Sequence, residues 1–216
     1  MRKSVPVGAL ALSAILALAV PARAVSFGFS CITNNNAGSC AIGEAQLSLN
    51  VTDAGGGNVL FTFGNSGPQA AVIAEVYFDD GVLQTMSQLT GSAGVAFAAG
   101  ATPANLPGGN TLSPPFVATF AAQANNPKPT NGVGPGETLG VQFTLQPGGT
   151  FADVINQLNS GDLRVGIHVT SFANGFSEGF IAHPVPEPAA LALFGVAAGA
   201  LSALGSWRRR GPRRST

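Results

Sequence analysis

Residues 138–145 read TLGVQFTL, a stretch in which apolar and other side chains alternate. The four apolar residues, at every second position from Leu139 to Leu145, fall on one face of an extended chain, and the residues between them fall on the other. This period of two predicts a strand with one buried and one solvated face, the pattern typical of antiparallel sheets.

The same alternation recurs in four other stretches, which are AQLSLNV (45–51), NVLFTF (58–63), AVIAEVYFDDG (71–81) and LRVGIHV (163–169). In the third of them, every second residue from Val72 to Phe78 is expected to share one face. Turn sequences follow the first three of these four stretches: DAGGGN, GNSGP and DDG. The last of them suits a tight hairpin. Many short strands with such turns predict a mainly β fold, an antiparallel β-sandwich or jelly roll of about eight strands. Its single core is expected to be filled mostly by the 14 phenylalanines.

Two segments depart from this pattern. Residues 99–136 are dense in Pro, Gly and Asn, which predicts two long surface loops on either side of a short strand at 116–122. The stretch TFADVINQL instead has apolar residues at helical spacing: Phe151, Val154, Ile155 and Leu158. Thr150 can cap this helix and Gly161 follows its end. We therefore expect one short helix that covers an open end of the sandwich.

The first 24 residues have the order of a secretory signal peptide. Arg2 and Lys3 precede an apolar stretch at 5–20, and the small-residue pattern Ala22-Arg23-Ala24 follows it. The sequence thus predicts export through the Sec machinery and removal of residues 1–24 by signal peptidase.

The charge of the region between the two ends is strongly acidic. Residues 25–185 contain nine Asp and Glu residues against only Lys128 and Arg164, so nine minus two leaves a net charge of minus seven. A body of this charge without a basic stripe is repelled by phosphate backbones, which argues against nucleic acid as a partner. Cations and neutral sugars are compatible with it.

Both cysteines lie in SCITNNNAGSC (30–40), within the part expected to be exported. An oxidising route favours a local Cys31–Cys40 disulfide. Closing so small a loop stabilises the fold by about 2.5 kcal/mol in the chain-entropy model. No histidine lies near the pair in the sequence, so a zinc site is not expected.

The sequence offers little for catalysis. His168 falls on the polar face of its strand together with Arg164, and His183 precedes the terminal segment, in what we expect to be a stalk. The sequence contains no GxSxG, no HExxH and no phosphate-binding glycine loop with its lysine. We therefore expect no enzyme, and a secreted hydrolase would require an acid to meet His168 in a pocket.

The best candidate for a ligand site is Asp79–Asp80, because adjacent carboxylates at a turn can offer oxygen ligands to calcium. DDG is equally a good turn sequence without any ion, and its spacing does not match the calcium loop D-x-[DN]-x-[DN]-G. The expectation is no cofactor, with calcium at these two residues as the alternative.

The C-terminal segment has an apolar run bounded by prolines and arginines. Residues 189–206 carry no charge and would span about 27 Å as a helix, just enough to cross a hydrocarbon core. Trp207 suits an interface. Five arginines would keep the C-terminus in the cytoplasm: Arg208, Arg209, Arg210, Arg213 and Arg214. The sequence predicts a transmembrane helix at 189–207, with the body on the outer side.

The order Val185-Pro186-Glu187-Pro188, then an apolar helix, then terminal arginines resembles the PEP-CTERM sorting signal of Gram-negative bacteria. The resemblance implies that the chain is a substrate of exosortase, a membrane transpeptidase-like enzyme that cuts near Pro-Glu-Pro and releases or re-attaches the ectodomain. It also implies an association with exopolysaccharide and biofilm or floc matrix. The two prolines fit this role, because they keep the approach to the helix extended.

The body also resembles exosortase-dependent surface proteins with an aromatic-Asp-Asp-Gly turn, here 78–81, and a late strand, here 164–169. This resemblance implies no catalytic activity.

Together these features predict a signal peptide (1–24), a β-sandwich ectodomain (25–182) and a sorting signal (183–216) with its motif (185–188), helix (189–207) and arginine tail (208–214). The expected function is that of a non-catalytic surface or matrix protein, first anchored in the inner membrane and then found at the cell surface or outside the cell. The alternative is a calcium-assisted or carbohydrate-binding module permanently anchored in the membrane, which would use the loops at 99–136.

Overall fold

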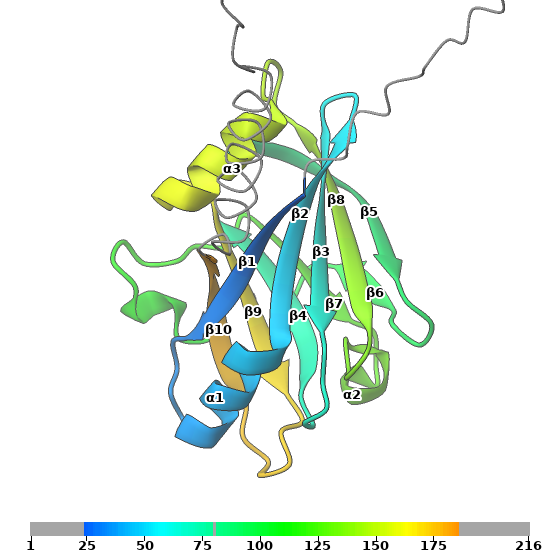
Figure 1. The fold of residues 1–216 in the computed structure, drawn as a ribbon, viewed down its shortest axis with the longest axis vertical. Helices are drawn as coiled ribbons and strands as arrows, with labels where there is room; N and C mark the ends of the chain where they lie inside the picture. The colour runs from blue at the N-terminus through cyan, green and yellow to red at the C-terminus, as the bar shows by residue number, and fades with distance from the viewer. Residues whose placement is uncertain (1–23, 80, 186–216) are drawn as a thin grey trace, which may run out of the picture.

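Figure 1 shows the computed structural model, which describes residues 24–79 and 81–185. The elements, in chain order, are β1 (Ala24–Cys31), α1 (Ala37–Gln46), β2 (Leu47–Gly55), β3 (Asn58–Asn65), β4 (Val72–Asp79), β5 (Leu83–Gly91), β6 (Phe97–Ala99), η1 (Gly109–Thr111), β7 (Phe120–Ala124), α2 (Lys128–Asn131), β8 (Thr138–Leu145), α3 (Phe151–Ser160), β9 (Arg164–Thr170) and β10 (Glu178–Pro184). The ten strands form one antiparallel sheet in the order β5-β8-β3-β2-β1-β10-β9-β4-β7-β6. The mainly β, antiparallel prediction is confirmed, with more strands than expected.

The sheet curls so that its two halves face each other across one core. The Phe78 ring of β4 lies 5.1 Å from the Phe61 ring of β3 and 4.7 Å from the Phe143 ring of β8, centroid to centroid. These strands are far apart in the strand order, so the contacts cross the core. The edge strands β5 and β6 approach each other, which nearly closes the sheet (Figure 1). The half of the sheet that contains β3 and β8 thus faces the half that contains β4 and β9. We call these halves the two walls; they face each other as in a sandwich, although hydrogen bonds join them into one sheet.

The predicted strands are present, and all of them except β4 bury the faces that we expected. The alternating apolar residues of β2, β3, β8 and β9 belong to the core. In β4 the expected face is wrong in part, because the pairing with β9 shifts register between Ile73 and Glu75. The shift places Ile73 in the core together with Val76 and Phe78. All described side chains of β4 are buried, so this strand is covered on both faces.

The turns between the strands agree with the sequence prediction only in part. DAGGGN joins β2 to β3 in a hairpin, and its three glycines, 55–57, all have positive φ, a region that side chains disfavour. The DDG hairpin prediction is wrong, because β4 pairs with β7 and β9 whereas β5 pairs with β8. The chain crosses from one wall to the other at this turn. It crosses in the same way after GNSGP, since β3 and β4 are not paired.

The predicted helix is confirmed as α3. Thr150 Oγ1 accepts a hydrogen bond from the Asp153 amide at 3.2 Å, while the Thr150 amide donates to the Asp153 carboxylate at 2.9 Å. This reciprocal cap fixes the first turn, and Gly161 ends the helix with φ at 85°. Val154 and Leu158 reach the core. Helix α3 thereby covers one end of the curled sheet, and α1 lies toward the other end (Figure 1).

Replacing Thr150 with alanine is expected to lower the free energy of unfolding by about 1 kcal/mol, because the amide of Asp153 loses its acceptor. Urea denaturation followed by circular dichroism measures the change. The exposed Thr85 of β5 provides the control, since its replacement by alanine removes no cap. Equal midpoints for the two variants would contradict the capping role.

Helix α1 begins in the segment that we expected to be a small disulfide loop and ends at Gln46, inside the stretch that we expected to be a strand. Its sequence AGSCAIGEAQ contains two glycines and little amphipathic pattern, so local propensity does not predict it. It forms because Asn36 Oδ1 accepts from the amides of Gly38 and Ser39, at 3.0 and 3.1 Å. Close packing also requires Gly43, because an added Cβ there would lie 2.2 Å from the Phe180 ring.

The loop region also differs from its prediction. The strand expected at 116–122 is β7, which begins at Phe120, and Phe116 instead lies buried in a second apolar cluster. A short strand, β6, precedes the first loop, and the short helix α2 lies in the second.

Candidate functional site

Three polar side chains of β4, those of Glu75, Tyr77 and Asp79, are buried outside the main core. They lie at every second position, so they share the outer face of the sheet. In the neighbouring strand β9, Glu75 pairs with His168 and Asp79 pairs with Arg164. The site is therefore a row of paired charges on the outer face of two adjacent strands.

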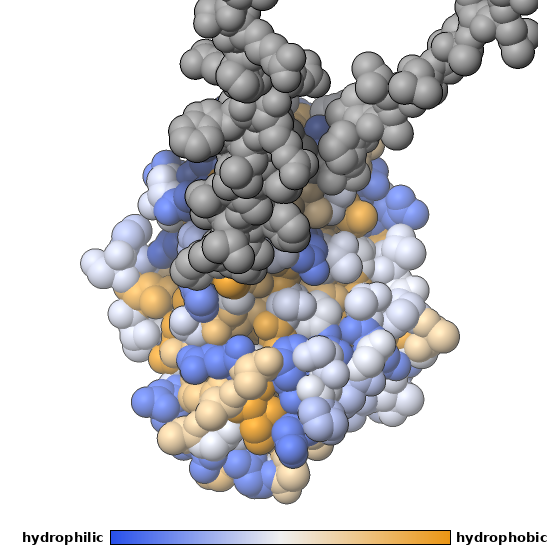
Figure 2. Space-filling model, viewed as in Figure 1, coloured by the Kyte–Doolittle hydropathy of each residue, from blue (hydrophilic) through white to orange (hydrophobic). Residues whose placement is uncertain are grey.

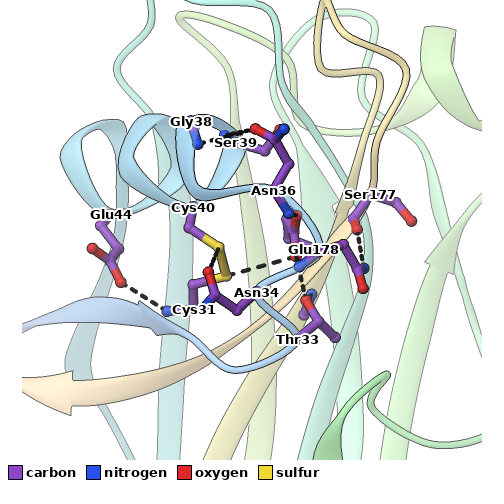
Figure 3. The surroundings of a disulfide bond; sticks show 12 residues. Cys31, Thr33, Asn34, Asn36, Gly38, Ser39, Cys40, Glu44, Ser177 and Glu178 are labelled. Carbon is purple, nitrogen blue, oxygen red and sulfur yellow. Dashed lines mark hydrogen bonds between the residues drawn. A yellow bond between two sulfur atoms is a disulfide. The ribbon is translucent and has the colours of Figure 1, made fainter.

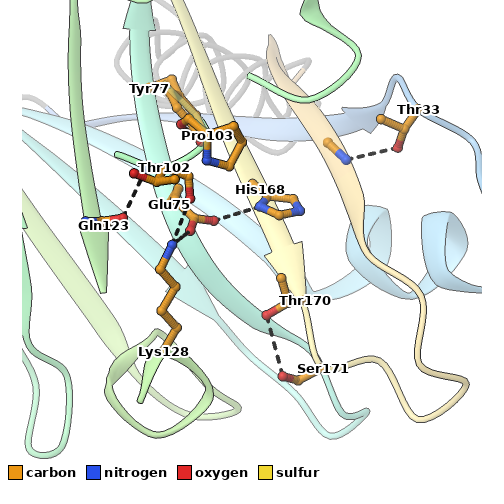
Figure 4. Close-up of polar contacts among 11 residues, drawn as sticks. Thr33, Glu75, Tyr77, Thr102, Pro103, Gln123, Lys128, His168, Thr170 and Ser171 are labelled. Atoms are coloured by element: carbon orange, nitrogen blue, oxygen red, sulfur yellow. Dashed lines mark hydrogen bonds and ion pairs between the residues drawn. The ribbon is translucent and has the colours of Figure 1, made fainter. Parts of the chain in front are cut away.

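Glu75 joins two potential cations (Figure 4). Its Oε2 atom lies 2.7 Å from His168 Nδ1, and its Oε1 atom forms an ion pair with Lys128 of α2. The Lys128 ammonium also donates to the Thr102 carbonyl at 2.8 Å. The Glu75 side chain is only 2% exposed, so both partners are needed to compensate its burial.

The pKa of Glu75 reflects this arrangement. Burial alone would raise it, but the hydrogen bonds and positive charges of His168 and Lys128 together outweigh burial and hold the pKa below its ordinary value. Burial, together with the Glu75 charge, raises the pKa of Tyr77, whose hydroxyl donates to the Pro103 carbonyl at 2.9 Å. Glu75 therefore stays ionised and Tyr77 stays a donor near neutral pH.

The second pair joins Asp79 to Arg164. Arg164 also donates to the Pro114 carbonyl at 2.6 Å and to the Pro115 carbonyl at 2.9 Å. Its guanidinium lies 5.4 Å from the centre of the Phe116 ring. The pairing affects the calcium prediction, because an ion would have to compete with Arg164 for Asp79. Asp80, the other predicted ligand, lies outside the described residues.

Both pairs hold the same piece of chain, residues 100–119, which we call the strap. Four strap carbonyls accept hydrogen bonds from the side chains of Lys128, Tyr77 and Arg164: those of Thr102, Pro103, Pro114 and Pro115. Tyr77, Leu106 and Phe116 form a second apolar cluster between strap and sheet. The first predicted surface loop thus packs against the outer face of the sheet.

Two glycines make room for the strap. At Gly166 of β9, an added Cβ would lie 2.4 Å from a Leu106 methyl group. At Gly179 of β10, it would lie 2.1 Å from the Pro107 carbonyl oxygen. The strap therefore approaches bare backbone, which larger residues at these positions would not allow.

His168 meets an acid, Glu75, as a hydrolase would require. Within residues 24–79 and 81–185, no hydroxyl or thiol group hydrogen-bonds to the His168 ring. Lys128 takes the other side of Glu75. The arrangement can orient a cation and hold the strap.

A second polar cluster surrounds the disulfide, which is confirmed between Cys31 and Cys40 (Figure 3). Glu178 is fully buried beside it and accepts hydrogen bonds from the amides of Asn35 and Asn36, at 2.9 and 2.7 Å, and from the Thr33 hydroxyl. In the described part of the chain, only Cys31, Cys40 and Glu178 form a group with metal-ligand spacing. Because the two sulfurs are bonded to each other, the group serves to fix the segment before α1.

The ends of the described body lie on neighbouring strands. Phe27 of β1 pairs with Pro184 of β10, and Gly28 pairs with His183. The stalk prediction for His183 is therefore wrong, since this residue belongs to a strand. Residues 186–188 of the motif, the helix at 189–207, the arginine tail and the signal peptide through Arg23 lie outside the described residues. Among the helices within the described ranges, none has the length and apolar character needed to cross a membrane.

Hydrophobic and hydrophilic residues are interspersed on the face shown in Figure 2. In the described part of the chain, the large hydrophobic residues classed as exposed are Val117, Phe176 and Val185. They come from the strap, the β9–β10 connection and the end of the body.

We compared the chain with protein-family models, curated proteins and solved structures, and found no match.

Proposed function

We propose that this chain is an exported, non-catalytic surface or matrix protein that exosortase sorts and processes at its C-terminal segment. The observation that carries the proposal is the order Pro-Glu-Pro (186–188), apolar helix and terminal arginines. In this scheme the Sec machinery exports the chain, signal peptidase removes residues 1–24, and the helix at 189–207 holds the precursor in the inner membrane. Processing then leaves the ectodomain at the cell surface or outside the cell, in association with exopolysaccharide.

The placement of the chain ends supports this scheme. Because β1 and β10 are antiparallel neighbours, Val25 and Pro184 lie toward the same end of the sheet. A body whose two ends lie at the same end of the sheet can face a membrane with that end and expose the rest of its surface to the outside. The Cys31–Cys40 disulfide is also compatible with an oxidising destination.

The fold suits a structural role. We class the body with β-sandwich and jelly-roll-like ectodomains, because two walls of antiparallel strands pack face to face over one phenylalanine-rich core. Its first long loop, which the binding-module alternative would use, is held against the sheet by side chains of the sheet and of α2. This supports a matrix component over a calcium-assisted or carbohydrate-binding module.

The proposal predicts a processed C-terminus. Intact-mass analysis of cell-surface material from cells with active exosortase should show a mature chain without the arginines at 208–214. Replacing both Pro186 and Pro188 with alanine should block this processing, because the approach to the helix is then free to become helical. A Pro184→Ala variant is the matched control, since Pro184 belongs to β10, and it should be processed normally. A wild-type mature chain that keeps its arginine tail would refute the proposal.

A further inference from the structure

We infer that the strap, residues 100–119, is a latched lid that opens as a unit from an intact β-body, and that its two ion pairs, Glu75–Lys128 and Asp79–Arg164, form the latch. This inference is independent of the proposed function, because it rests only on the described residues.

The base of the strap allows it to move by itself. The strap begins after β6 and ends at β7, and these strands pair with each other at Ala99 and Ala122. The Gly100 amide also donates to the Ala121 carbonyl at 2.7 Å. Because the strap leaves and rejoins the sheet at one place, lifting it does not require any pair of strands to separate.

The latch uses both of the Lys and Arg residues of the body. Lys128 and Arg164 are the only Lys and Arg residues between 24 and 185, and both donate to strap carbonyls. Each is directed there by a buried carboxylate of β4, Glu75 or Asp79. In an acidic body, both of these cations thus hydrogen-bond to the same loop.

Opening would uncover a defined surface. Beneath the strap lie Tyr77 of β4, Gly166 of β9 and Ile181 of β10, which pair in register across three strands. Leu106 now fills the space over Gly166. An open strap would therefore expose an apolar strip of sheet that the closed form hides.

The latch should weaken in acid. The titratable and charged groups facing Glu75 are His168 from β9, Lys128 from α2 and Tyr77 on its own strand; Arg164 faces Asp79. Because the pKa of Glu75 is lowered in the folded protein, its contribution is fully present above the ordinary value of 4.5 and is lost as the pH falls through the lowered value. A protonated Glu75 would then leave the Lys128 ammonium without its anion.

Hydrogen exchange of the full chain, followed by mass spectrometry and corrected for intrinsic rates, tests the inference. At neutral pH a Glu75→Gln, Asp79→Asn variant should exchange the strap amides that donate to the sheet, those of Thr102 to Gln123 and of Thr119 to Phe78, roughly 10- to 100-fold faster. These hydrogen bonds break when the strap lifts, whereas hydrogen bonds within the strap move with it. Amides of β3 and β8 should keep their protection. A Glu44→Gln, Asp162→Asn variant carries the same charge change at exposed positions and should leave strap exchange unchanged.

A second variant opens the strap without touching the latch. Gly179→Ala places a methyl group against the Pro107 carbonyl and should also speed strap exchange while β3 and β8 stay protected. In the wild-type chain, acid below the lowered pKa of Glu75 should do the same, and the Glu75→Gln, Asp79→Asn variant should show little further change. Strap and core amides that always exchange together, or a strap that stays protected in the Glu75→Gln, Asp79→Asn variant, would overturn the inference.

Discussion

Replacing Phe78 with alanine is expected to lower the free energy of unfolding by about 3 to 5 kcal/mol, because a large buried ring is lost and the cavity collapses only in part. The Phe78 ring contacts those of Phe61, Phe63 and Phe143 in edge-to-face geometry, with centroid distances of 5.1, 6.0 and 4.7 Å. These contacts connect the two walls of the sheet across the core. Losing them should weaken the packing of the walls against each other as well as remove buried area.

Urea denaturation of the full chain measures this effect, with the slope of the transition as a check on two-state behaviour. Phe176 gives a matched control, since its side chain is 44% exposed. Its replacement by alanine should change the stability by no more than about 0.5 kcal/mol. Similar midpoints for the two variants would mean that the walls do not depend on Phe78.

The alternation of apolar residues was enough to predict the strands with one wet face, and the spacing around α3 was enough to predict that helix. Both patterns are local, because burial of one face repeats along the chain itself. The pairing of strands is not local. DDG looks like a hairpin turn, yet β4 and β5 lie in opposite walls, and only the distant partners β8 and β9 decide this.

The same limit applies to the site. Asp79 was predicted as an ion ligand from its neighbour Asp80, whereas its partner in the fold is Arg164, which lies opposite it on the neighbouring strand β9. Sequence reasoning missed the pair of Glu75 and His168 for the same reason. One signal was available in the sequence. The strand β4 carries two acids, Glu75 and Asp79, and each acid needs a cation if the strand is buried on both faces. The body has only two Lys or Arg residues to supply these cations.

Replacing both Cys31 and Cys40 with serine is expected to lower the free energy of unfolding by about 2 to 4 kcal/mol, toward the low end because the closed loop is short. The disulfide joins the end of β1 to α1, a helix whose own sequence favours it only weakly. Glu178 holds the segment between them through the amides of Asn35 and Asn36. Without the disulfide, the segment between β1 and α1 is free to move, and its hydrogen bonds to Glu178 weaken. The amides of α1 should therefore lose protection from hydrogen exchange before those of the strands do.

Reduction of the wild-type chain provides the control, because dithiothreitol should move its urea midpoint to that of the double serine variant and leave the variant unchanged. If the oxidised wild type and the variant unfold at the same urea concentration, the disulfide adds nothing and Glu178 alone fixes the segment. A Glu178→Gln variant separates the two contributions. It keeps the shape of the side chain and the disulfide, but turns one of the two acceptor oxygens into a donor group that faces amide donors. It should therefore destabilise the oxidised chain as well as the reduced one.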